Sequence, residues 1–298
     1  MQVSKEELKK VDEEIEQIYK ENAYPTVSTN MIDKIIDIKP NERILDSYKY
    51  TYDLYLEYIS YLSNLSDEQL KLYLKAIKNS DVIDNQKMET KDSFLISLYM
   101  QAEKTHAIDT LLKHKKLNND NLQEAHKILT EVICENINPY YRNNNRRFVG
   151  NWVNGNRNIE YMPLHYKYIN DAMEKFFNYY NESENDEINL FIKPFKIHAI
   201  IAAIQVFEDG NTRLARLLQN VKLYRQTNQF LDTDFKGPII YATKQYHPYR
   251  KDYRNLIKEL AINPTDEIVN NWLEFNLRRL EEALWVGNAN TEKVLLKK

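Results

Sequence analysis

The stretch that decides the fold of this chain is KIHAIIAAIQVFEDGNTRLARLLQ, residues 196–219. Its first part, residues 197–204, is apolar at every position except His198, which predicts a helix buried on all sides. Residues 207–211 then interrupt the helix, because glycine tolerates positive φ and Asp or Asn can cap a following helix. Leucines recur at helical spacing after Thr212, so a second helix is expected to begin there.

The start of that second helix carries the features of an anion-binding site. A helix N-terminus offers free backbone N–H groups and the positive end of the helix dipole, and Arg213 and Arg216 follow closely. Asp209 stands beside them and can hold a divalent cation that bridges to phosphate oxygens. The pattern indicates a nucleotide polyphosphate bound at this helix.

The same stretch resembles the Fic family, whose members transfer AMP onto protein hydroxyls. The family signature is His-Pro-Phe-x-(Asp/Glu)-Gly-Asn-x-Arg-x-x-Arg, and the matching segment is QVFEDGNTRLAR, residues 205–216. Most defining positions keep the family's spacing, which is far more specific than a lone glycine loop. The resemblance implies a metal at Asp209, with Mg²⁺ as the ion, and an ATP site formed by Phe207, Gly210, Asn211, Thr212, Arg213 and Arg216.

Gln205 occupies the position of the family's catalytic histidine. A protein hydroxyl is a weak nucleophile and needs a base to take its proton, which imidazole does near neutral pH. A primary amide has no usable pKa, and losing general-base help costs about 10²–10⁴-fold in rate. His198 cannot replace the base, because it lies about 10 Å away along the helix axis, and we expect it to be hydrogen-bonded inside the core. Transfer is therefore predicted to be poor or absent, whether Gln205 is natural or engineered.

An upstream segment, SDVIDN at residues 80–85, resembles the inhibitory motif of self-inhibited Fic proteins. That motif reads (Ser/Thr)-x-x-x-Glu-(Gly/Asn), so Ser80 and Asn85 match and Asp84 replaces the glutamate. In the family, the glutamate pairs with the last motif arginine, here Arg216, and keeps the γ-phosphate from binding productively. A carboxylate and a phosphate compete for one guanidinium fork, although the shorter Asp84 leaves open a longer, water-bridged or missing pair. An ordinary helix cap or turn is the alternative interpretation.

Residues 147–162, RFVGNWVNGNRNIEYM, form the one good β-hairpin candidate. Aromatic and β-branched residues flank an Asn-Gly pair, which is a strong hairpin signal. The segment resembles the flap of Fic enzymes, which pairs with a target protein through main-chain hydrogen bonds. The resemblance implies docking of a target at Trp152, Val153, Asn154 and Gly155. A hairpin that merely covers the core is the alternative.

Three further segments carry weaker predictions. His126 is expected to be a structural hydrogen-bonding residue. The basic loop at 139–147 is interpreted as solvated, or else as facing an acidic target. Tyr253 or Arg254 lies in a tyrosine-rich segment similar to one beside the family's adenine and ribose, and either lines the pocket or is simply packed.

Composition favours a mostly helical, soluble protein. Of the 298 residues, 43% are hydrophobic, 29% are charged and only five are glycine, which favours long helices. The net charge of −3 without a basic block argues against nucleic acid or an anionic membrane as partner. No apolar run reaches the ~18–20 residues of a membrane span. The single cysteine, Cys134, excludes an internal disulfide and fits a cytoplasmic location.

We therefore expect an all-α protein with one small hairpin. The predicted parts are an N-terminal helical region (1–78), a Fic core with inhibitory helix, flap and motif (79–280), and a C-terminal tail (281–298). The predicted activity is self-inhibited AMP transfer from ATP to a Ser, Thr or Tyr hydroxyl of a target protein. A catalytically silent nucleotide-binding module and a helical interaction protein with a vestigial anion site are the alternatives. The target, the nucleotide preference and the oligomeric state, including a homo-oligomer, are left open.

Overall fold

The computed structural model describes residues 4–88, 105–130, 138–153, 156–182 and 189–296. Cys134 and the Asn154-Gly155 pair lie outside these ranges. Within them, no helix is both long enough and apolar enough to cross a membrane. In chain order the elements are α1 (Lys5–Glu21), α2 (Met31–Asp37), α3 (Glu42–Ser63), α4 (Asp67–Lys87), α6 (Thr105–Lys113), α7 (Asn119–Thr130), β1 (Val149–Val153), β2 (Asn156–Tyr161), η1 (Tyr166–Tyr168), α8 (Ile169–Asn181), α9 (Asn189–Ile204), α10 (Asn211–Phe230), α11 (Thr243–Tyr246), η2 (His247–Tyr249), α12 (Arg250–Ile262) and α13 (Asp266–Leu296).

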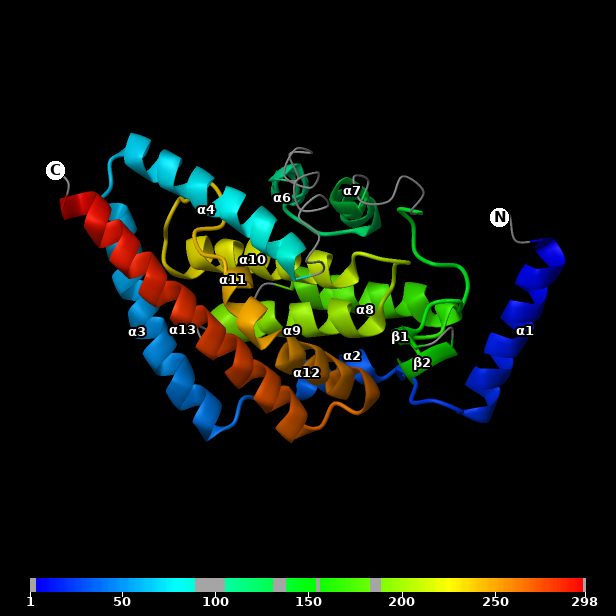
Figure 1. The fold of residues 1–298 in the computed structure, drawn as a ribbon. Helices are drawn as coiled ribbons and strands as arrows, with labels where there is room; N and C mark the ends of the chain where they lie inside the picture. Colours follow the sequence, from blue (N-terminus) through cyan, green and yellow to red (C-terminus); the bar gives the residue numbers. More distant parts are fainter. Residues whose placement is uncertain (1–3, 89–104, 131–137, 154–155, 183–188, 297–298) are drawn as a thin grey trace.

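Helices α9 and α10 pack against each other at the centre of the molecule (Figure 1). Every residue of α9 after Asn189 is buried, as predicted for residues 197–204. Helices α2, α8, α12 and α13 pack against α9, while α4, α6 and α7 pack against α10. Because α9 touches neighbours on all sides, its sequence needs no polar face. Over the described residues, the all-α prediction with a single hairpin is confirmed.

His198 is a buried structural histidine, as predicted. Its Nδ1 donates to Oε1 of Gln219 at 2.6 Å, and its Nε2 accepts from the hydroxyl of Tyr253 at 2.8 Å. Burial lowers the pKa of His198 to about 3. The ring is therefore neutral at physiological pH, and it fastens α9 to α10 and α12.

Helix α13 runs further than the sequence pattern predicted. Residues 281–296, expected to form a tail, continue the helix, which packs along α3 (Figure 1). Gly287 lies within this continuation of the helix. A Cβ at this position would come within 2.8 Å of Cε2 of Tyr58, so the glycine permits close approach of α3 instead of ending the helix. The boundary that we expected between the N-terminal region and the core, after residue 78, lies inside α4.

The predicted hairpin is confirmed by an antiparallel β1–β2 pair. The register pairs Val149 with Tyr161 and Val153 with Asn156, and it is irregular between Val149 and Gly150. At the base of the hairpin, the N-terminal segment adds a parallel bridge between Thr26 and Met162.

Candidate functional site

A cavity of about 480 Å³ lies between the hairpin, the N-terminus of α10 and α12. Its walls include four predicted site residues, namely Gln205, Asp209, Asn211 and Thr212. Tyr253 and Arg254 also line it, as the tyrosine-rich segment suggested. The cavity is in the size range of small-molecule sites in proteins.

The turn between α9 and α10 is built around Gly210. Its φ of 79° lies in the left-handed region, and it is the N-cap of α10. The sequence favoured capping by an Asp or Asn side chain, and this was wrong. Asn211 is the first helical residue, and its side chain reaches back to Phe207 instead. Its Oδ1 accepts from the Phe207 N–H, and its Nδ2 donates to the Phe207 carbonyl, each at 2.9 Å.

His126 of α7 stabilises the same turn through a hydrogen bond and a stacked ring. Its Nε2 donates to the carbonyl of Asp209 at 2.7 Å, and its ring stacks on Phe207 with centroids 3.7 Å apart. Burial lowers the pKa of His126 to about 4, so the ring is neutral. The structural role predicted for His126 is confirmed. Phe207 is wholly buried in this stack and acts as an anchor of the turn.

Gln205 lies at the edge of the cavity with both ends of its amide engaged. Its Nε2 donates to the carbonyl of Ala202 at 2.5 Å, and its Oε1 accepts from Nδ2 of Asn211 at 3.2 Å. Its φ is 53°, a left-handed conformation that costs a residue with a Cβ about 1–2 kcal/mol. The surroundings of Gln205 must compensate that cost.

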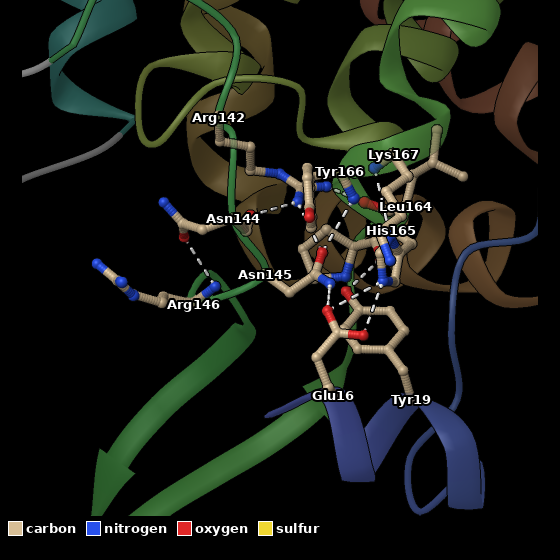
Figure 2. Close-up of polar contacts among 11 residues, drawn as sticks. Glu16, Tyr19, Arg142, Asn144, Asn145, Arg146, Leu164, His165, Tyr166 and Lys167 are labelled. Carbon is tan, nitrogen blue, oxygen red and sulfur yellow. Dashed lines mark hydrogen bonds and ion pairs between the residues drawn. The ribbon is translucent and has the colours of Figure 1, made fainter. Parts of the chain in front are cut away.

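Arg142 supplies much of that compensation, and Figure 2 shows Arg142 beside Asn144 and Leu164. Its Nε donates to the carbonyl of Gln205 at 2.8 Å, and its backbone N–H donates to the carbonyl of Val206 at 3.0 Å. The rest of the guanidinium donates to the carbonyls of Asn144, at 3.1 Å, and of Leu164. Burial lowers the pKa of Arg142 to about 10, so it stays charged. Sequence reasoning placed Arg142 in a solvated loop, because its partners are main-chain oxygens that leave no pattern in the sequence.

Helix α1 holds the segment that precedes the hairpin and the one that follows it (Figure 2). Asp12 pairs with Nε and Nη2 of Arg146, both at 2.7 Å. Glu16 accepts from Nδ2 of Asn145 at 2.8 Å and lies 3.2 Å from Nε2 of His165. The N-terminal helix thus contacts the segments on both sides of the hairpin.

The two motif arginines bind protein groups. Arg216, 1% exposed, donates from Nε to Oδ1 of Asn85 at 2.6 Å and from Nη2 to the Asn85 carbonyl at 3.3 Å. Its Nη1 donates to the hydroxyl of Tyr253 at 3.3 Å. Arg213, 3% exposed, pairs with Oδ2 of Asp209 at 3.3 Å. Both guanidinium groups are therefore held next to the turn by the protein itself.

The proposed inhibitory segment lies in the last two turns of α4. The motif made Asp84 the candidate partner of Arg216 while leaving a missing pair open, and Asp84 accepts from Oγ of Ser80 at 3.2 Å and from Nζ of Lys87 at 3.4 Å. Asn85, the next residue, makes the contact with Arg216. Adjacent helical residues point about 100° apart, so the two cannot both face α10. Asn85, one position beyond the candidate Asp84, therefore contacts Arg216.

One wall of the cavity consists of residues that the sequence did not single out. Glu160 of β2 and Lys258 of α12 both line it and form an ion pair of 3.3 Å. Arg147 and Tyr161 line the same side. These residues come together because the hairpin packs on α12, a contact between segments about a hundred residues apart that no local motif encodes.

The fold and the site define an all-α domain in which a cavity lies between the N-terminus of α10, the hairpin and α12. Residues 116–223 match the model of the Fic/DOC family. A Fic domain containing signaling protein from Bacteroides thetaiotaomicron is 15% identical, covering 82% of this chain and 97% of its own, with a TM-score of 0.58. A fragment of Fic-1 from C. elegans is 14% identical, covering 84% and 70%, with a TM-score of 0.56. At these identities the likeness shows a shared fold. The comparison with curated proteins gave no match.

Proposed function

We propose that this chain is a Fic-type adenylyltransferase that binds ATP with Mg²⁺ and transfers AMP poorly to a protein hydroxyl. The observation that carries the proposal is the cavity at the N-terminus of α10. It joins Asp209, Asn211 and Thr212 to Gln205, which stands at the position of the family's base. Backbone N–H groups at the start of a helix favour phosphate oxygens.

Asp209 fits a magnesium ion shared with a nucleotide. Its side chain is 46% exposed and lines the cavity. In the described part of the chain, no three His, Cys, Asp or Glu residues gather to hold a metal by themselves. Mg²⁺ commonly takes one or two protein carboxylates and completes its shell with phosphates and waters. Bound in this way, the ion would neutralise charge on the phosphates.

In this proposal, Asn85 is the residue that causes self-inhibition. A terminal phosphate would need the guanidinium of Arg216, which donates two hydrogen bonds to Asn85. The amide oxygen is neutral, whereas a phosphate is strongly anionic and makes stronger charge-assisted bonds. We therefore expect inhibition that ATP overcomes more easily than inhibition by a carboxylate.

The transfer step would be slow because the proton of the target hydroxyl has no base. The hydroxyl oxygen would form a bond to the α-phosphorus while the bond to the pyrophosphate leaving group breaks, and the proton would pass to water. Gln205 cannot take it, because a primary amide has no usable pKa, and its Nε2 and Oε1 bond instead to Ala202 and Asn211. The expected loss relative to a histidine is about 10²–10⁴-fold.

The hairpin is the proposed docking place for the target. Trp152 and Val153 lie on β1, and the β1–β2 pair is a two-stranded sheet to whose outer edge a target segment can add main-chain hydrogen bonds. Docking of this kind recognises extended backbone and places a side-chain hydroxyl near the cavity.

The test compares the parent chain with Gln205→His and Gln205→Ala. Calorimetry with ATP and Mg²⁺ measures binding, and labelled AMP on protein measures transfer. We expect binding by all three proteins and a gain in transfer for the histidine variant alone. Binding without transfer in Gln205→His would support a silent nucleotide-binding module. Loss of binding in all three would leave a helical interaction protein whose anion site is vestigial.

A further inference from the structure

A second cavity, of about 150 Å³, is walled by α3, α4, α13 and the segment 240–245. It shares no lining residue with the cavity at α10. Asp81 of α4 and Tyr241, which are distant in sequence, both line it. The cavity is therefore formed by tertiary packing, and its polar walls come from separate parts of the chain.

The walls hold buried polar groups without hydrogen-bond partners. Asp81 is 3% exposed, and neither of its carboxylate oxygens makes a well-formed hydrogen bond among the described residues, although the Thr243 hydroxyl lies close enough to lower its pKa. The hydroxyl of Tyr241 is buried and unpartnered in the same sense. The hydroxyls of Tyr58 and Tyr73, 3.0 Å apart, lie on another wall. A buried carboxylate without a close partner is strongly unfavourable, so a positively charged donor bound in this cavity would stabilise Asp81.

The electrostatics of the cavity agree with this geometry. Burial raises the pKa of Asp81 to about 7, and the nearby charge of Asp84 raises it further. The Thr243 hydroxyl and the Arg216 guanidinium act in the opposite direction. Among the described lining residues, the one cationic side chain is Lys244, which is exposed.

We propose that this cavity binds a small monovalent cation with N–H donors, meaning ammonium or a primary alkylammonium. Asp81 supplies the counter-charge, and the tyrosine hydroxyls supply acceptors. A divalent metal fits poorly, because Ca²⁺ takes six to eight oxygen ligands and Mg²⁺ a near-ideal octahedron. A water molecule occupies about 30 Å³ in the liquid, so the cavity suits a ligand of a few heavy atoms.

Occupancy of this cavity is connected to the first cavity through α4. Asp81 and Asn85 lie one turn apart on that helix, and Asn85 holds Arg216. A cation that neutralises Asp81 stabilises the end of α4 and, with it, the Asn85–Arg216 contact. Ligands at the two cavities would then oppose each other's binding by the same factor. This connection rests on the proposed function, whereas cation binding itself does not.

Thermal unfolding tests the binding. The protein is melted at pH 8 and pH 5 in ammonium, ethylammonium or tetramethylammonium chloride at one ionic strength. We expect the first two salts to raise Tm by several degrees at pH 8 and to have little effect at pH 5, where a proton occupies Asp81. Tetramethylammonium has no N–H donor and should not act. Equal effects of all three salts would overturn the proposal.

Variants make the test specific to the site. Asp81→Asn should lose the response to ammonium, and Tyr241→Phe should weaken apparent affinity several-fold. Lys244→Met is the matched control and should respond as the parent does. A parent-like response in Asp81→Asn overturns the site, and so does calorimetry at pH 7 that detects no proton release on binding to the parent.

A second measurement separates the site from the proposed function. ATP affinity is measured with and without ethylammonium, and we expect several-fold weaker ATP binding in its presence. If Tm responds but ATP affinity does not, the connection through α4 is wrong and the cation site stands. If ATP does not bind at all, the proposed function fails while the Tm response still decides the site.

Discussion

Arg216 of α10 donates from Nε to the amide oxygen of Asn85 on α4, at 2.6 Å. This contact places a neutral side chain where the sequence motif suggested the carboxylate of Asp84. Hydrogen bonds to charged groups contribute about 1.5–3 kcal/mol, so the contact is strong enough to compete with a ligand. It makes Asn85 the residue to change first.

Removing the Asn85 side chain should tighten ATP binding. In Asn85→Ala, a terminal phosphate no longer displaces an amide oxygen from Arg216, and we expect roughly 10-fold tighter binding by calorimetry. Asp84→Ala is the matched control, because Asp84 bonds to Ser80 and Lys87. Its effect should stay within about 2-fold. A larger effect of Asp84→Ala would restore Asp84 as the inhibitory residue.

Gly210 should tolerate no side chain. Its φ is 79°, and an added Cβ would lie 2.7 Å from Cγ2 of Thr130 and 3.2 Å from Nε2 of His126. Gly210→Ala should therefore destabilise the fold by about 1–3 kcal/mol and weaken ATP binding, because the turn must move. Gly237→Ala provides the control, since the nearest atom to its added Cβ is 3.9 Å away. Urea unfolding that gives both variants the same midpoint would contradict this reading of the turn.

Local patterns were sufficient to predict the centre of the fold. The apolar run at 197–204, the glycine turn and the leucine spacing after Thr212 each determine their own conformation, and α9 and α10 follow them. The hairpin was equally predictable, because its connection and both strands lie within 16 consecutive residues.

Features that depend on distant packing were not predictable from the sequence. Arg142 binds carbonyls of Gln205 and Leu164, 63 and 22 residues away, and a carbonyl oxygen has no residue identity to recognise. The rotation of α4 about its own axis decides whether Asp84 or Asn85 faces Arg216, and the motif does not encode that rotation. The tail expected from residue 281 continues α13 instead, and the close packing of Gly287 on Tyr58 of α3 is invisible in the sequence.

Acidification should destabilise the protein between about pH 6.5 and pH 4. The pKa values of His126 and His198 are about 4 and 3 in the fold, below the unfolded value of about 6.5. In this range the unfolded chain binds protons that the folded chain does not, so each histidine lowers stability by up to about 1.4 kcal/mol per pH unit as the pH falls. Asp81 acts oppositely, because its pKa of about 7 exceeds the unfolded value. Because Asp81 offsets one of the two histidines, the free energy of unfolding should fall with decreasing pH at the slope of a single histidine.

Urea midpoints from pH 4.5 to pH 6.5 measure that slope. His126→Gln keeps a donor toward the Asp209 carbonyl but removes one titrating group, so the profile should become nearly flat. Asp81→Asn should make the profile steeper and should stabilise the protein most above pH 7. An unchanged slope in both variants would show that other groups determine the acid response.

Arg142 should matter more to stability than its neighbour Arg146. Arg142 is buried and donates to several main-chain oxygens, so Arg142→Lys, with a point charge and a different geometry, leaves some of them unsatisfied. We expect a loss of about 2–4 kcal/mol in the free energy of unfolding. Arg146→Ala removes an exposed pair with Asp12 and should cost less than about 1 kcal/mol.

A local measurement distinguishes positioning by Arg142 from general stabilisation. Amide hydrogen exchange should accelerate at residues 205–211 in Arg142→Lys under conditions where the exchange of α9 is unchanged, because the left-handed Gln205 loses its carbonyl partner. In the Gln205→His background, Arg142→Lys should lower the rate constant of AMP transfer more than it lowers ATP affinity. Equal loss of both, with uniform exchange across α9 and the turn, would mean that Arg142 only stabilises the fold. The guanidinium would then not determine where the residue at position 205 points.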